Sequence, residues 1–446
     1  MSVAAAYAPS LARRATLSRA GYLFLSVLLI LVFEGAVRKW VTNAASLPLV
    51  ALRDVLALGL VVYAWQGGYF RRYKKIAAVL FAWTCLVFGW GLMQLVGGES
   101  TPVIMIIGMR FWLLYVWFAV AAAATLNEAD FRAAIYVAAG LVLVMAPLAV
   151  LQHFSPIGAR INKQLDGDEG VFVVVTGVVR TTGTFSFTSG YSTFLSLIAP
   201  LVFGILGAKK RTRLHHLFAI AVFVALLVGS LVSGSRTTAV SSSAMFLAYL
   251  FGRLMFSKMR QKPKAAVAVV MALVLTAIFA YVFRQSIGYT QERFEQASEM
   301  EDFLGRILTI FFGESGISNA ITWLGYGVGY GSNLANFVRT GSVGFFVPAE
   351  TESGRILVEG GLLGVAFIAL KVILVVVGIT KSIRLSAKTN SPFPMLVWLS
   401  TMVAVITWSA IGQLTSNGML GILLAYALLV FQYPRLEIFP PRASRL

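Results

Sequence analysis

The sequence predicts an all-α, polytopic membrane protein with about twelve transmembrane helices. Three observations lead to this fold class. Hydrophobic residues make up 58% of the 446 residues, and charged residues make up only 12%. Apolar runs of about 18–22 residues, the length that crosses a bilayer as a helix, recur from end to end. The net charge of +19 gathers in alternate loops, as in proteins that obey the positive-inside rule.

The apolar runs define the elements in order. Each run has to satisfy its own backbone N–H and C=O groups in the hydrocarbon core, and a helix does this within one segment. The expected spans are centred near Leu28, Leu58, Thr84, Tyr115, Leu143, Leu197, Val224, Phe246, Leu273, Gly364, Val403 and Ala425. We therefore expect residues 1–446 to form a single integral membrane domain, with two long loops at 154–188 and 284–353.

Charge fixes the expected orientation. One set of loops is rich in lysine and arginine and nearly free of acids: the N-terminal arm, 71–75, 132, 209–213, 253–264, 381–388 and 435–445. Cytoplasmic loops carry such an excess, so both termini are expected in the cytoplasm. Basic residues precede the first apolar stretch and no small-residue cleavage pattern follows it, so this stretch is expected to be a retained anchor. The basicity reflects topology and implies no nucleic-acid partner.

Several arginines lie at the other, outer ends of the spans, where the positive-inside rule does not explain them. They are Arg38, Arg53, Arg110, Arg236 and Arg355. A cation at membrane depth is expensive and usually lines a functional cavity or binds an anion. Because outer carboxylates nearly balance these arginines, the pattern indicates placed Arg–acid pairs rather than excess charge.

The motif SGSRTT at 233–238 joins two spans at the outer face. Its hydroxyls can cap the helix that follows, which places Arg236 at a helix N-terminus. A guanidinium beside free helix-end amides suits a phosphate group, since the fork geometry matches phosphate oxygens and the helix dipole favours an anion. The alternative is an arginine that reaches lipid headgroups from a turn; the short Ser-Gly-Ser turn favours the phosphate site.

Four other basic positions have structural alternatives. In FEGAVRKW and LRD, Arg38 and Arg53 lie close to Glu34 and Asp54. These groups can form a buried ion network, which serves a scaffold and a binding site equally well. In GMRFW, Arg110 lies in the outer part of the fourth span and is hard to explain by snorkelling, so a cavity role is expected. In VVRTTGTFSF, Arg180 can bind substrate or be a solvated loop residue.

The segment PAETESGRILVEGGLLG at 348–364 is the densest group of charges. Glu352, Arg355 and Glu359 are spaced three and four apart and share one face of a helix. They can form an internal salt-bridge ladder, or a carboxylate and an arginine can serve as a general base beside an anionic substrate. Upstream, WLGYGVGYGSN alternates glycines with large residues, which predicts a loop that approaches other backbone closely and not a nucleotide site.

In order and sidedness, SGSRTT, WLGYGVGYG and ETESGRILVEGGLLG resemble the O-antigen ligase and polymerase (Wzy-type) superfamily. FEGAVRKW and RTTGTFSF look like its exopolysaccharide polymerase branch. The resemblance implies a GT-C-like, metal-independent glycosyltransferase of the bacterial inner membrane, with periplasmic loops at 154–188 and 284–353. It also implies a donor glycan on undecaprenyl diphosphate, no cofactor, and contacts with membrane lipids and with flippase, chain-length or export proteins.

One departure from the superfamily pattern bears on the reaction. Ligases usually show a His-Asn pair shortly before the E-x-G-L-L-G stretch, and here Glu350 and Thr351 occupy those positions. The missing histidine favours a polymerase of lipid-linked repeat units over a ligase. It leaves Glu350 or Glu352 as the expected base, with Arg236 and Arg355 as the carried-over arginines.

Two alternatives remain. A ligase that transfers finished glycan to lipid A core or to protein would share the fold and differ in acceptor. A flippase for lipid-linked glycans would also need a cationic cavity, but it would not need a long outer loop or an acid–arginine face. For the polymerase, Arg236 with Arg110 or Arg355 is expected to hold the diphosphate, and Arg38, Arg53 and Arg180 are expected to contribute to diphosphate or glycan binding.

Overall fold

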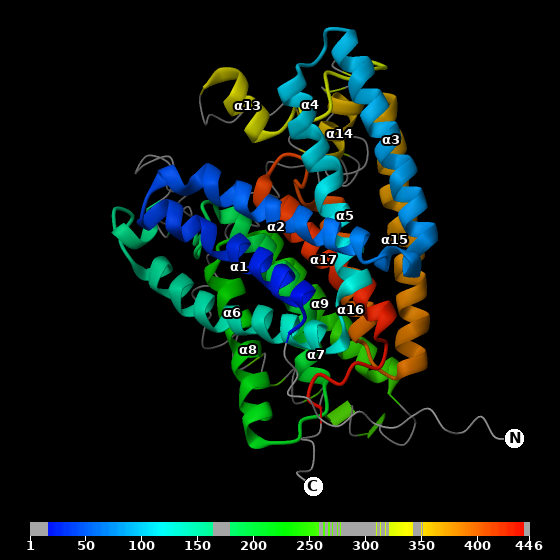
Figure 1. Cartoon of the computed structure of the whole chain (residues 1–446). Helices are drawn as coiled ribbons and strands as arrows, with labels where there is room; N and C mark the ends of the chain where they lie inside the picture. The colour runs from blue at the N-terminus through cyan, green and yellow to red at the C-terminus, as the bar shows by residue number, and fades with distance from the viewer. Residues whose placement is uncertain are drawn as a thin grey trace, which may run out of the picture.

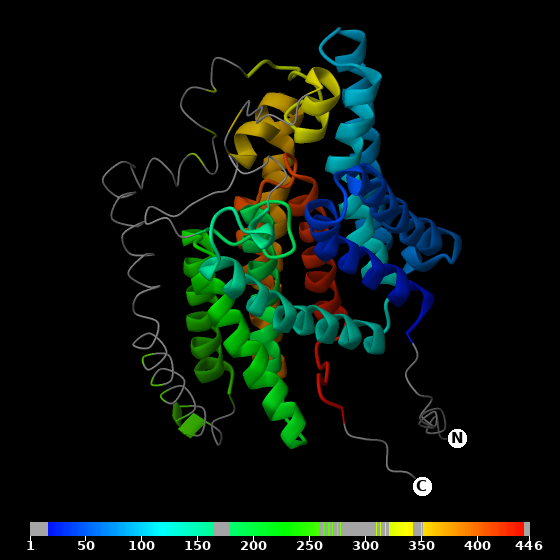
Figure 2. The ribbon, with the colours of Figure 1, turned by 90° about the vertical axis from the view of Figure 1, so that its left-hand side faces the viewer.

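The computed structural model describes residues 17–163, 179–257, 321–341 and 351–440, with isolated positions between these ranges. Ten helices in this described part are long and apolar enough to cross a membrane. The predicted class, an all-α polytopic membrane protein, is confirmed. Figures 1 and 2 show the helices gathered in one bundle, with α3 and α15 rising along one side in Figure 1.

The first half of the chain forms a series of long helices joined by short turns. They are α1 (Arg19–Trp40), α2 (Ser46–Gln66), α3 (Lys74–Val96), α4 (Pro102–Met109), α5 (Tyr115–Thr125) and α6 (Glu128–Phe154). One π-helical turn, η3 (Arg110–Leu114), joins α4 to α5 within a single span. The turn after α6 contains a short 3-10 helix, η4 (Arg160–Asn162).

In the described part of the remaining chain, there are three α-helices before residue 258, one short α-helix within the large loop, and four α-helices from Glu352 onward. They are α7 (Thr188–Gly207), α8 (Arg213–Val232), α9 (Arg236–Phe256), α13 (Asn333–Thr340), α14 (Glu352–Gly360), α15 (Leu362–Thr389), α16 (Phe393–Thr407) and α17 (Leu414–Gln432).

Helix starts follow from local chemistry. A capping box begins α6, because the Asn127 side chain accepts from the Asp130 amide and the Asp130 carboxylate accepts from the Asn127 amide. Ser235 caps α9 by accepting from the amide of Thr238. Gly361 has φ +53°, and this left-handed residue separates α14 from α15.

Two expected spans differ from the structure, and a third, near Leu273, falls almost entirely outside the described residues. The span expected near Val403 is α16, which has only 15 residues because it ends before the non-helical segment 408–413. The span expected near Gly364 begins there instead, since the break at Gly361 moves the whole of α15 toward the C-terminus.

The core sits around α7. In the most apolar 18-residue stretch of α7, 83% of the residues are buried, whereas in the corresponding stretch of the span that contains α3 only 17% are buried. Helices α8, α9, α16 and α17 all pack against α7. The large exposed apolar side chains of α3, such as Phe81 and Phe88, then face the position that lipid takes around a bundle.

The short turns make successive helices run in opposite directions, so the bundle has two ends. The basic end holds the turns 67–73, 208–212 and 390–392 and the last residues of α9. The arginine end holds the C-termini of α1, α6 and α8 and the N-termini of α2, α7, α9 and α15. In Figure 1 the turn between α3 and α4 lies at the top and the start of α8 at the bottom. All the arginines that the sequence singles out lie toward the arginine end.

Candidate functional site

The first group of charges joins α1 to α2. The guanidinium of Arg53 donates to both carboxylate oxygens of Glu34, at 2.9 and 2.8 Å. Arg53 is fully buried and Glu34 is 3% exposed. The hydroxyl of Thr415 donates to the same carboxylate at 3.4 Å. Of the ion network predicted from FEGAVRKW and LRD, the pairs of Arg53 with Glu34 and Asp54 are present, and among the described residues no ion pair of Arg38 is. The Glu34–Arg53 pair fixes the outer halves of α1 and α2 to the start of α17.

The second group surrounds Asp54. Arg110 donates to both of its oxygens, at 2.8 and 3.1 Å, and the hydroxyl of Tyr115 donates to it at 2.9 Å. Arg110 also donates to the side-chain oxygen of Asn417 at 3.4 Å. The π-helical turn begins at Arg110, and the extra residue in this turn lets Arg110 and Tyr115, five positions apart, reach the same carboxylate.

The third group lies on α14. The carboxylate of Glu352 accepts from the backbone amide of Ile411 at 3.1 and 3.2 Å. The ammonium of Lys371, from α15, lies 3.7 Å from the same carboxylate, so the lysine pairs within the bundle. Burial raises the pKa of the Glu352 carboxyl above its usual range, and the nearby charges of Lys371 and Arg355 oppose this rise.

Arg355 follows Glu352 by one turn of α14 and is 6% exposed. Its guanidinium donates to the backbone carbonyls of Ala349 at 2.8 Å and Gly331 at 3.4 Å. It packs flat against Gly412, where a Cβ would collide with it. Beside it lies the hydroxyl of Ser409, which is buried and has no hydrogen-bond partner among the described residues.

Glu359, on the same face of α14, has a different role. Its carboxylate accepts from the amides of Gly329 and Gly331 and from the indole of Trp112, each at 2.9 Å. The same loop approaches α4 so closely that a Cβ at Gly329 would lie 2.5 Å from the amide nitrogen of Gly108. The close backbone approach predicted from WLGYGVGYGSN is confirmed. Burial raises the pKa of Glu359 to about 7, because desolvation outweighs these three donors.

Arg236 and Arg180 lie in a further part of the arginine end. Arg236 is the first residue of α9, at the capped N-terminus predicted from SGSRTT, and it is half-buried. Arg180 is also half-buried. Its neighbour Thr181 donates to the carbonyl of Val232, which precedes the SGSRTT turn, at 3.3 Å. The two predicted motifs are thus adjacent.

Arg38 lies near the end of α1, where its Nε donates to the hydroxyl of Ser46 at 2.8 Å. The next residue, Lys39, is 2% exposed. Its ammonium donates to the hydroxyl of Thr182 and the carbonyl of Gly183, both at 2.8 Å. The RTTG segment therefore lies between the end of α1 and the start of α9. Glu350 lies outside the described residues.

Sequence reasoning missed the segment Ser409–Asn417, which joins α16 to α17 and includes the first turn of α17. It contacts Glu352 through Ile411, Arg355 through Gly412, Glu34 through Thr415 and Arg110 through Asn417. Its Gln413 also accepts from Ser189 at the start of α7, at 3.2 Å. The signal was present in the letters SAIGQLTSNG, a polar, glycine-containing interruption between two apolar runs.

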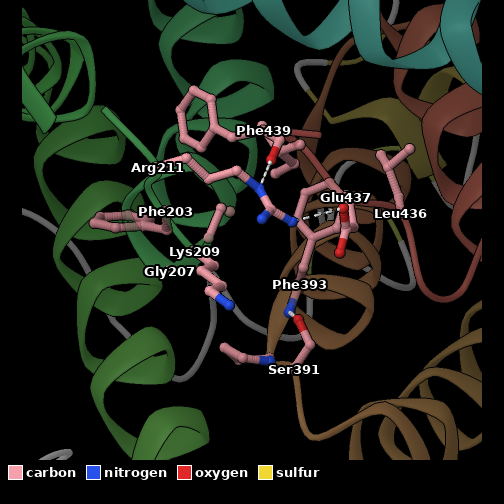
Figure 3. A pocket seen from close by; sticks show the side chains of 13 residues that line it. Phe203, Gly207, Lys209, Arg211, Ser391, Phe393, Leu436, Glu437 and Phe439 are labelled. Carbon is pink, nitrogen blue, oxygen red and sulfur yellow. Dashed lines mark hydrogen bonds and ion pairs between the residues drawn. The ribbon is translucent and has the colours of Figure 1, made fainter. Parts of the chain in front are cut away.

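A pocket of about 140 Å³ lies at the basic end of the bundle. Figure 3 shows Arg211 pointing toward the C-terminal segment, where it meets the carboxylate of Glu437 at 3.1 Å and the carbonyl of Phe439 at 3.0 Å. Lys209 and Phe393 also line this pocket. Arg211 thus holds the C-terminal segment against the basic end of the bundle, opposite the arginine groups described above.

Comparison with known proteins bears on the middle part of the chain. The family model described as O-antigen polysaccharide polymerase Wzy matches residues 171–347. The matched range includes RTTG, SGSRTT and the glycine loop. No curated protein matches the chain significantly.

Proposed function

We infer that this chain is a polymerase of the Wzy type, whose family model matches residues 171–347, and that it joins lipid-linked oligosaccharide repeat units into a polysaccharide at the arginine end of its bundle. The family supports repeat-unit polymerisation in general. One observation supports this location of the active site. The single segment Ser409–Asn417 contacts four charged side chains, those of Glu352, Arg355, Arg110 and Glu34.

The finer parts of the proposal concern place and substrate. We place the protein in the bacterial inner membrane with both termini in the cytoplasm and the arginine end in the periplasm. The donor is a repeat unit on undecaprenyl diphosphate, and the product serves exopolysaccharide, capsule or O-antigen synthesis. Flippase and chain-length or export proteins are the proposed partners. The positive-inside charge pattern supports the orientation, and the buried arginines support a diphosphate-bearing donor.

The residues divide into two roles. Arg236, Arg355 and Arg110 are proposed to contact the diphosphate, and Arg38 and Arg180 the diphosphate or the glycan. Arg53 is fully buried against Glu34, so we propose that it positions the end of α1 rather than touching substrate. Lys371 holds Glu352 in place. The hydroxyl of Ser409, which is buried without a partner among the described residues and lies beside Arg355, is proposed to contact substrate.

The proposed reaction is one displacement. The hydroxyl oxygen of the acceptor sugar forms a bond to the anomeric carbon of the donor glycan, and the bond from that carbon to the diphosphate oxygen breaks. The lipid diphosphate leaves with the electron pair, stabilised by the arginines in a water-poor site. Glu352, or Glu350, accepts the proton of the hydroxyl. Since the diphosphate is a good leaving group and arginines neutralise it, the reaction is proposed to need no metal ion.

Transfer to a different acceptor and translocation are the competing functions, and one assay separates them. Purified protein is placed in liposomes with lipid-linked repeats, in buffer containing EDTA. Longer lipid-linked chains are expected. Transfer only to lipid A core or to protein would establish a ligase. Translocation of the lipid-linked repeats without new glycosidic bonds would establish a flippase. A requirement for added divalent cation would contradict the metal-free reaction.

Two substitutions test the site in that assay. Glu352→Gln removes the base but keeps its shape, and Arg236→Ala removes a charge opposite the diphosphate; each should lower the rate at least 100-fold. Glu437→Gln and Arg384→Ala, at the basic end, are the matched controls and should keep the normal rate. A near-normal rate in either site variant, with protein that elutes as a folded single species, would remove that residue from the mechanism.

A further inference from the structure

A cavity of about 600 Å³ opens at the outer end of α1, apart from the groups on α14 and Asp54. Four cationic side chains line it: Arg38, Lys39, Arg160 and Lys163. Among the residues that the structure describes, no carboxylate lines it. The groups around Glu34, Asp54 and α14 each include carboxylates, so the cavity differs from them in carrying positive charge without a described carboxylate.

The cavity is built on a fixed frame. Gln152, 1% exposed on α6, accepts from the amide of Gly183 at 2.8 Å and donates to the carbonyl of Ile161 in η4 at 3.0 Å. Asn162 in the same turn donates to the carbonyl of Pro156 at 2.8 Å. These bonds set Arg160 and Lys163 of the η4 turn beside the end of α1, so the cations are held near one another despite their mutual repulsion.

The polar partners in the cavity are neutral. The buried Lys39 is held by a hydroxyl and a carbonyl, and Arg38 by the hydroxyl of Ser46. The indole N–H of Trp40, another lining residue, is buried and has no partner among the described residues. Positive charge without an opposing carboxylate, together with an unused donor and an aromatic ring, is what an anionic sugar or phosphate needs.

We propose that this cavity is an anion site that binds an acidic group, a carboxylate or a phosphate, of the lipid-linked glycan. The site accepts one or two negative charges through Arg38, Arg160 and Lys163, and the ring of Trp40 offers a face to the adjoining sugar. Anion binding in the cavity stands by itself; its assignment to the substrate rests on the proposed polymerase function.

Binding tests the site without turnover. The full-length protein in detergent is titrated with inorganic pyrophosphate, with trigalacturonate and with neutral maltotriose, and the dissociation constants are measured by calorimetry. At least one anion should bind, more weakly as salt is raised. Arg160→Gln/Lys163→Gln should weaken that binding at least tenfold, and Arg160→Lys/Lys163→Arg should preserve it. Arg384→Gln/Lys388→Gln, at the basic end, should have no effect.

The two anionic probes separate the two possible sources of the negative charge. Tighter binding of pyrophosphate indicates that the site takes a diphosphate headgroup, and tighter binding of trigalacturonate indicates that it takes an acidic glycan. Equal binding of maltotriose, or anion binding unchanged in the double glutamine variant, would overturn the site. Asp166, Asp168 and Glu169 follow Lys163 in the sequence and lie outside the described residues. Anion binding that appears only in the variant Asp166→Asn/Asp168→Asn/Glu169→Gln, and not in the natural sequence, would also overturn the site. The Glu352→Gln variant, inactive as a polymerase because it lacks the proposed base, should bind the anion normally, so failure of the site and failure of the function are distinguishable.

Discussion

Three arginines at the arginine end are held by different kinds of partner, and the partner determines what removal of each arginine costs. Arg53 is paired with a carboxylate out of contact with solvent, Arg110 shares Asp54 with a tyrosine, and Arg355 is held by backbone carbonyls. A fully buried pair is not a strong source of stability as such. Breaking it is expensive, because the remaining charge stays buried and unpaired.

Replacing one partner of the buried pair should therefore destabilise the protein strongly. Glu34→Gln is expected to lower the free energy of unfolding by about 3–5 kcal/mol, because Arg53 stays buried and charged with only the carboxylate of Asp54, 3.5 Å away, as a counter-ion. The measurement is denaturant unfolding in a fixed detergent. Glu437→Gln is the control: its pair with Arg211 has side chains 58% and 30% exposed, so a loss below about 1 kcal/mol is expected. Equal losses would show that Arg53 finds another partner.

The environment of Glu352 predicts a pH dependence of the reaction. A base has to be ionised to accept a proton, and burial raises the pKa of the Glu352 carboxyl. The rate should then fall on acidification at a pH above about 4.3, the ordinary glutamate value, and it should be highest on the alkaline side. Initial rates of polymerisation between pH 4.5 and 8.5 measure this.

A second carboxyl could produce the same acidic loss of rate, since the pKa of Glu359 is raised to about 7. Glu359→Gln separates the two. If Glu352 is responsible, the acidic fall persists in Glu359→Gln, at whatever overall rate that variant retains. If the fall disappears, protonation of Glu359 and release of the glycine loop is the cause, and the role of Glu352 as base is contradicted.

At the scale of elements, the glycine loop and α4 depend on each other. Gly325, Gly327 and Gly329 have positive φ, and the loop touches the helix at Gly108, where a Cβ would collide with the carbonyl of Val328. Glu359 then fixes the loop from the other side through two amides. The loop thus joins α4 to α14, and the position of Arg355 depends on it.

A methyl group at this contact should separate the two elements. Gly108→Ala is expected to cost about 1–3 kcal/mol through overpacking and to lower polymerase activity, since the loop and the carbonyl of Gly331 would shift away from Arg355. Gly140→Ala, in α6, is the control because no atom lies within 4 Å of its added Cβ. Thermal unfolding and initial rates measure both variants. Similar behaviour of the two would mean that the loop adjusts without consequence.

Some elements were predictable and others were not, for physical reasons. Long apolar runs predict spans because a bilayer imposes a length, and capping residues predict the start of α9 at Arg236. The sequence could suggest the Glu34–Arg53 network because its members are near in sequence. It could not suggest Asp54–Arg110–Asn417 or Glu352–Ile411, since these pairs join distant positions through packing. The end of α16 at Thr407 was missed because apolar residues continue past it.

At the scale of the molecule, the two ends of the bundle differ in composition and are proposed to face different compartments. Labelling tests this on a Cys85→Ala background, which removes the single native thiol. Lys163→Cys should react with a membrane-impermeant maleimide in spheroplasts, which have lost the outer membrane. Lys388→Cys should react only after the inner membrane is permeabilised. The reverse result would invert the topology and place the candidate site in the cytoplasm.

The central position of α7 has a consequence for biogenesis. This helix emerges from the ribosome before most of the helices that cover it: α9, α16 and α17 are all made later. Until α16 and α17 have been translated, the side of α7 that they cover, including the Ser196 carbonyl that accepts from the Ser400 hydroxyl of α16, lacks these protein neighbours. A nascent chain truncated before Phe393 would thus expose this side of α7 and remain a target for membrane quality-control proteases. Synthesis of α16 and α17 covers α7 and completes the fold.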